Sequence, residues 1–125
     1  MQRSVIILAC LWIAQAISCG SGEVRSDIPI RAPETITLKM AQKEVAEAQE
    51  ELEKEKLERL PEYAPQEFLK AEQFVRDART ELNEENEEPA YYHAAKAKAY
   101  LRLARAKKEL EIARNQLKSL EEELR

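Results

Sequence analysis

Residues 89–124 read PAYYHAAKAKAYLRLARAKKELEIARNQLKSLEEEL, and this stretch decides the fold class. Its apolar residues recur at alternating intervals of three and four positions, which is the pattern of helices that pack nearly side by side. These positions are Leu103, Ala106, Leu110, Ala113, Leu117, Leu120 and Leu124, preceded by Tyr92, Ala95 and Ala99. We therefore predict one long amphipathic helix over residues 89–124.

Two earlier segments repeat the same spacing. In residues 33–60 the apolar positions are Leu38, Ala41, Val45, Ala48 and Leu52, and in residues 65–82 they are Phe68, Ala71, Val75, Ala78 and Leu82. Pro33, Pro65 and Pro89 each stand where a first helical residue tolerates a missing N–H. Nothing in these segments alternates with the period of a strand. We therefore expect an all-α fold of three helices, 33–60, 65–82 and 89–124, with coiled-coil-like packing.

The lengths of these helices allow two arrangements. At 1.5 Å per residue the three helices are about 42, 27 and 54 Å long. In an antiparallel bundle, the end of the longest helix extends beyond its partners and exposes Leu117, Leu120 and Leu124, which would then form an oligomer face for a second chain. In a bent helical hairpin, the first two helices form one arm and the third folds back along both. The spacing does not choose between these arrangements.

The N-terminal residues carry the features of a bacterial lipoprotein. Val5–Ala14 is an apolar run of ten, too short for a membrane span of roughly 20 residues and typical of a secretory signal. Ala16-Ile17-Ser18-Cys19 resembles a lipobox, in which the cysteine is acylated and becomes the first residue of the mature chain. The resemblance implies a signal peptide over 1–18 and lipidation at Cys19. The polar stretch after Cys19 and the prolines Pro29 and Pro33 then predict a tether over 19–32, before a helical domain over 33–125. Ordinary cleavage after Ala14-Gln15-Ala16, which would leave Ile17 first, is the alternative.

The composition narrows the classes of function. The chain has 20 basic and 24 acidic residues and a formal charge of −4, so we expect no nucleic-acid partner. Its two glycines and single histidine leave little room for a phosphate-binding loop or a histidine metal site. We therefore predict no cofactor, no metal, no catalytic residue and no enzymatic activity. Membrane attachment is expected to come from acyl chains at about 0.8 kcal/mol per buried methylene.

A basic segment is the main candidate binding surface. Residues 89–108 contain Lys96, Lys98, Arg102, Arg105, Lys107 and Lys108 and no acidic residue. Lys98, Arg102 and Arg105 share one helix face. This face would suit an anionic envelope polymer or an acidic partner. We favour the structural alternative, in which it pairs with the acidic residues of the first helix, which are Glu44, Glu47, Glu50 and Glu51.

Three weaker candidates have structural interpretations that we prefer. The acidic residues Glu84, Glu85, Glu87 and Glu88 could ligate calcium, but they lack a turn glycine and fit a solvated turn. His93 has no sequence-placed nucleophile to serve as a base. The tyrosines could line a ligand groove, but such residues more often fill helix junctions. They are Tyr63, Tyr91, Tyr92 and Tyr100.

The central part of the chain resembles a known bacterial family. The residues that carry the resemblance are Glu62-Tyr63-Ala64-Pro65-Gln66-Glu67-Phe68, continued by Ala71, Ala78, Leu82, Tyr92, Ala95 and Ala99. They are similar to the domain-of-unknown-function family 4398, over roughly residues 33–108. The family usually has Gly-Asp at the second turn, where this chain has Glu87-Glu88-Pro89. The resemblance implies alanine-rich helices in a small envelope lipoprotein and supplies no mechanism.

Together these observations predict a lipid-anchored helical protein of the bacterial cell envelope with a structural or protein-interaction role. Gly20 follows Cys19 where enterobacterial sorting reads Asp as an inner-membrane signal, so this resemblance favours the outer membrane. The expected partners are the membrane, an envelope protein that the sequence does not identify, and a further copy of the chain. The periplasmic and surface-facing sides both stay open. The alternative is a ligand-binding module or adhesin that uses the basic face.

Overall fold

The structure is a computed structural model that describes Pro33 and residues 35–125. The predicted signal peptide, Cys19 and the predicted tether of residues 19–32 lie outside the described residues. Four α-helices follow in order: α1 (Leu38–Leu57), α2 (Leu60–Tyr63), α3 (Pro65–Asn83) and α4 (Glu87–Glu123). The described residues form no strand, so the all-α fold class is confirmed.

α1 begins at Leu38, five residues later than the predicted start at Pro33. Thr37 has an extended backbone, and its hydroxyl oxygen accepts a hydrogen bond from the Met40 N–H at 3.3 Å. This side chain satisfies one of the N–H groups that a first helical turn leaves free. The cap, rather than the proline, therefore sets the start of the helix, and Pro33 is exposed outside it.

α1 ends at Leu57, three residues before the predicted end at residue 60. Arg59 is left-handed, with φ of 63°, a strained conformation for a residue with a side chain. A bidentate pair to Glu62, with nitrogen–oxygen distances of 2.8 and 2.7 Å, and the full burial of Leu60 hold this turn in place. The single turn of α2 then reverses the chain.

The later boundaries lie close to the predicted ones. α3 begins with Pro65 at its first position, as expected, and ends one residue after the predicted residue 82. α4 begins at Glu87, so Pro89 lies inside the first turn rather than at its first position. The turn between α3 and α4 contains no glycine. It is closed instead by Asn86, whose backbone N–H donates to the Glu81 carbonyl oxygen at 2.9 Å.

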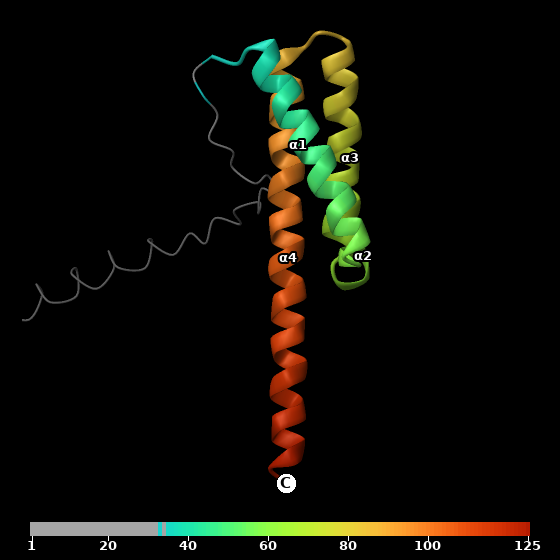
Figure 1. The fold of residues 1–125 in the computed structure, drawn as a ribbon, viewed down its shortest axis with the longest axis vertical. Coiled ribbons are helices and arrows are strands. Elements are labelled where there is room, and N and C mark those ends of the chain that lie inside the picture. Colours follow the sequence, from blue (N-terminus) through green and yellow to red (C-terminus); the bar gives the residue numbers. More distant parts are fainter. Residues whose placement is uncertain (1–32, 34) are drawn as a thin grey trace, which may run out of the picture.

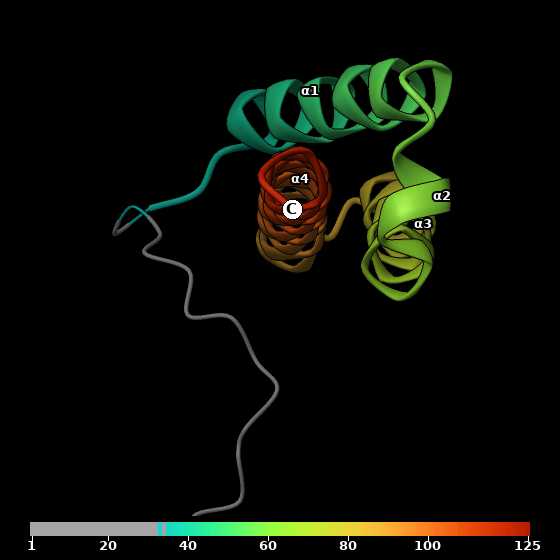
Figure 2. The same ribbon diagram turned by 90° about the horizontal axis from the view of Figure 1, so that it is seen from below.

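The helices form an antiparallel bundle. α3 and α4 run in opposite directions side by side, and α1 lies diagonally across both (Figures 1 and 2). Because α2 reverses the chain, α1 packs against α3 and does not extend it as one arm. The bent hairpin is therefore not the arrangement of this protein.

The core lies between the three long helices and is rich in alanine. α1 contributes Ala41, Val45, Ala48 and Leu52, and α3 contributes Phe68, Ala71, Val75 and Ala78, all of which were predicted. Of the other two predicted positions, Leu82 is partly buried, and Leu38, the first residue of α1, is 42% exposed. α4 contributes Ala90, Ala94, Ala97, Leu101 and Ala104. Small side chains at these positions allow the helix axes to approach closely.

The predicted packing face of α4 is wrong at Leu103 and Ala106, which lie within the bundle, whereas exposure of Leu117, Leu120 and Leu124 is what the bundle arrangement predicts. Ala99 of the predicted face is buried and Ala95 is half-buried, but Leu103 and all later members are exposed. Leu103 follows the fully buried Leu101 by two residues, so it lies about 200° around the helix from it. α4 carries two apolar faces with the same spacing, and the bundle buries the alanine-rich one.

Candidate functional site: the basic segment and the projecting end of α4

The basic segment of α4 is anchored to α1 by Lys98. Its ammonium lies 3.0 Å from Glu44 and 2.8 Å from Glu47, and the Lys98 side chain is 17% exposed. Burial alone would lower the pKa of Lys98, but the hydrogen bonds and charges of Glu47 and Glu44 outweigh it and raise the pKa. The hydrogen bond from Lys98, aided by its charge, lowers the pKa of Glu47.

Arg105 makes a second connection to α1. It lies 3.1 Å from Glu51 and 3.2 Å from Glu55. Glu55 is only 2% exposed, so its carboxylate is buried beside this guanidinium. The predicted pairing with Glu44, Glu47 and Glu51 is thus present, whereas Glu50 is exposed and Glu55 was missed. The spacing could have predicted its burial, because Glu55 follows Leu52 by three residues and so continues the series of buried positions on α1.

The next two lysines join α4 to the far end of the bundle. Lys107 pairs with Glu67 of α3, and this hydrogen bond lowers the pKa of Glu67. Lys108 donates to the Glu58 carbonyl oxygen at 3.0 Å, and its ammonium lies 5.4 Å from the centre of the Tyr63 ring. Tyr63 is the last residue of α2 and is exposed, so it does not fill the helix junction as its structural interpretation predicts.

Arg102 differs from the other two residues of the predicted binding face. It is exposed, and no ion pair within residues 35–125 involves it. Lys98 and Arg105 are committed to the packing of α1, so the structure does not bring the three cations together as a free surface. Anion binding at Lys98, Arg102 and Arg105 stays a prediction.

Aromatic rings join α3 and α4. Phe74 stacks on His93 and on Tyr100, with ring centroids 5.8 and 5.6 Å apart. The ammonium groups of Lys70 and Lys96 lie over Tyr100 and Phe74, respectively. The Nδ1 atom of His93 is buried and has no hydrogen-bond partner in the described part of the chain. His93 thus contributes a ring to packing at this helix pair.

The acidic turn between α3 and α4 is organised by an amide. Asn86 Nδ2 donates to Glu81 Oε2 at 2.9 Å and to Glu84 Oε2 at 3.4 Å. Glu84, Glu85 and Glu88 are exposed, and Glu87 is half-buried. Over Pro33 and residues 35–125, no three acidic, histidine or cysteine side chains are placed to hold a metal ion.

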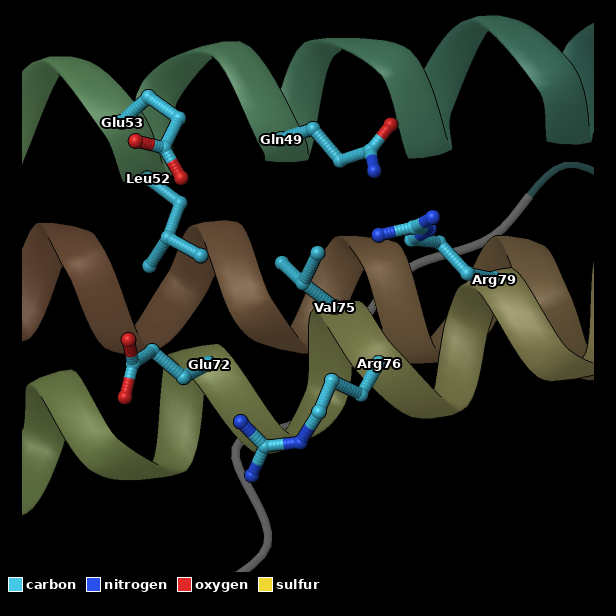
Figure 3. Close-up of a pocket in the computed structure, with 7 residues that line it drawn as sticks. All are labelled: Gln49, Leu52, Glu53, Glu72, Val75, Arg76 and Arg79. Carbon is cyan, nitrogen blue, oxygen red and sulfur yellow. The ribbon is translucent and has the colours of Figure 1, made fainter.

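An open groove of about 230 Å³ runs between α1 and α3 (Figure 3). Leu52 and Val75 lie between the two helices, with Glu53 and Glu72 toward one end and Arg79 toward the other. Its other lining residues are Gln49 and Arg76. No serine, cysteine or histidine lines this groove, so it offers no nucleophile–histidine pair.

The projecting end of α4 is the most distinctive surface of the molecule. Beyond Lys108 every residue of the helix is exposed, and Figure 1 shows this end extending past the other helices. We define the outward stripe as the exposed apolar residues Leu103, Ala106, Leu110, Ala113, Leu117, Leu120 and Leu124. The predicted overhang is confirmed, because Leu117, Leu120 and Leu124 are 59%, 56% and 88% exposed.

Cys19 lies outside the described residues, so lipidation there stays a prediction. None of the described helices is both long and apolar enough to cross a bilayer. Compared with known proteins, the chain matches no family model, no curated protein and no solved structure. The resemblance to the domain-of-unknown-function family 4398 therefore stays an expectation based on the residues quoted above.

Proposed function

We propose that this chain is a lipid-anchored protein of the bacterial cell envelope with a non-catalytic, protein-interaction role. In this proposal acyl chains on Cys19 hold the mature chain on the membrane, with the outer membrane favoured. The helical bundle then presents the projecting end of α4 to a partner.

The observation that carries the interaction role is the exposure of the outward stripe. Its four leucines on the projecting end, from Leu110 to Leu124, are each more than half exposed and recur at heptad spacing. Large contiguous apolar patches on a protein surface mark interaction sites, because exposure of such area to water is unfavourable. The charged residues that could have formed a binding face are instead largely used within the bundle.

The anchor is tested by the mass of the native protein. We expect the chain extracted from membranes to begin at Cys19 and to carry a diacyl or triacyl adduct, because one chain alone anchors only weakly. Cys19→Ser should leave the protein out of the extracted membrane fraction. Cys10→Ser, inside the predicted signal peptide, is the matched control and should not change the adduct. An unmodified Cys19 thiol, or a chain that begins at Ile17, would contradict this part of the proposal.

A further inference from the structure

The outward stripe has the length and spacing of a coiled-coil seam. From Leu103 to Leu124 its members follow one another at intervals of three and four, which spans three heptads. Figure 2 shows α1 and α3 on two sides of α4. The buried alanine-rich face of α4 packs against these helices, whereas Leu103 and the later members of the stripe are exposed. A second helix can therefore lie along the stripe from Leu103 to the end of α4.

We propose that the occupant of the outward stripe is the same stripe of a second copy, with the two α4 helices antiparallel. This inference rests on the proposed interaction role and names the partner. It follows from two kinds of complementarity within α4, one of side-chain size and one of charge.

Side-chain size favours the antiparallel orientation. When Leu110 of one copy faces Ala113 of the other, Leu117 faces Ala106 and Leu103 faces Leu120, because the two helices run in opposite directions. Between Leu103 and Leu120, four of the six layers then pair a leucine with an alanine, the other two pair leucines, and no layer pairs two alanines, which favours dense packing. In a parallel dimer in register, Ala106 and Ala113 would each face themselves. These alanine layers would leave gaps between the leucine layers.

Charge favours the same orientation. The last turn of α4 carries Glu121, Glu122 and Glu123, while residues 89–108 are basic without an acid. In the antiparallel dimer the acidic end of each copy lies beside the basic segment of the other. Glu123 then reaches Arg102, an exposed cation for which the described residues supply no ion pair, and two such pairs form by symmetry. In a parallel dimer the acidic ends would meet, with repulsion between them.

Two contacts between like charges, related by the symmetry of the dimer, oppose this arrangement, and an ion pair within each bundle weakens their repulsion. Lys107 of one copy comes near Arg114 of the other at the edge of the interface. Lys107 is already paired with Glu67 within its own bundle, so much of its charge is neutralised. The two favourable Arg102–Glu123 pairs therefore decide the orientation.

The oligomeric state of the full chain, measured by sedimentation, tests the interface. We expect the detergent-extracted protein to sediment as a dimer, and Leu117→Glu to raise its dissociation constant at least about 100-fold, because the carboxylate would be buried unpaired. Leu69→Glu is the matched control, since Leu69 of α3 is 57% exposed against 59% for Leu117 and lies off the stripe. It should leave the dimer intact. Circular dichroism should show helix in both variants, because neither residue is buried.

Charge reversal tests the orientation. Arg102→Glu and Glu123→Arg should each weaken the dimer about tenfold, and the double variant should restore it, because only the antiparallel dimer brings these residues together. A failure of the double variant to recover would overturn the antiparallel orientation. A chain that is monomeric at every concentration would overturn the dimer, and would mean that the stripe meets another protein or the chain's own N-terminal residues. The acyl adduct on Cys19 is measured separately, so failure of the anchor and failure of the dimer are distinguishable.

Discussion

Single ion pairs fix how α4 meets its neighbours. Lys98 bridges two carboxylates one turn apart on α1, and Arg105 bridges another two one turn further along. Both cations lie on one face of α4, so they set the register of α1 against it. Exposed ion pairs contribute little to stability, but these are partly buried and joined across helices far apart in the sequence. The basic segment thus has a structural role that composition alone does not reveal.

The pH dependence of stability tests the Lys98–Glu47 pair. The pKa of Glu47 is lowered from its ordinary 4.5, so the pair stabilises the folded state above that pH and is lost as pH falls through the lowered value. We expect Glu47→Gln to reduce the free energy of unfolding by about 0.5 kcal/mol at neutral pH, a small value because the side chain is partly in water. Chemical unfolding of both proteins from pH 7 downward measures the difference, which should vanish in acid. Equal stability at neutral pH would contradict the role of this pair.

At the scale of the elements, single side chains set where a helix begins and ends, and the spacing of apolar residues does not identify them. Pro33 and Thr37 are both plausible helix starts, and the sequence favoured the proline. The hydroxyl of Thr37 sets the start of α1, because it accepts a hydrogen bond from the Met40 N–H. The end of α1 was also mispredicted, since a left-handed Arg59 is not visible in the spacing of apolar residues.

The cap of α1 can be tested by a pair of threonines. Thr37→Ala should lower the free energy of unfolding by about 1 kcal/mol, because the Met40 N–H loses its partner. Thr35→Ala is the control, since Thr35 is exposed and outside the helix, and should cost well under half as much. Thermal unfolding followed by circular dichroism measures both. Equal losses in the two variants would show that Thr37 does not cap α1.

The core faces of α1 and α3 were predicted correctly except at the exposed Leu38, but the buried face of α4 was not predicted. α1 and α3 each have a single apolar face, whereas α4 has two with the same spacing, one of alanines and one mainly of leucines. Because leucine is more hydrophobic than alanine, the sequence favoured the outward stripe as the packing face of α4. The bundle buries the alanine face because Ala90, Ala94 and Ala97 let α4 lie close to both neighbours.

At the scale of the whole molecule, the bundle accounts for only part of α4. The described helix has 37 residues, and those after Lys108 have no helix beside them and extend about 22 Å at 1.5 Å per residue. Helix lengths predicted this overhang once a bundle was assumed, but they could not exclude the hairpin. The reversal at α2, which excludes it, depends on the conformation of Arg59 and the burial of Leu60.

In the native protein, we propose, the outward stripe is covered by a second copy of the chain. Hydrogen–deuterium exchange of the membrane-extracted chain tests it most directly, because an isolated helical end opens locally and exchanges quickly. We predict that residues 109–123 are protected to a similar degree as residues 90–104, and that Leu117→Glu removes the protection of residues 109–123 alone. Rapid exchange of residues 109–123 in the unaltered protein, beside a protected bundle, would contradict the claim.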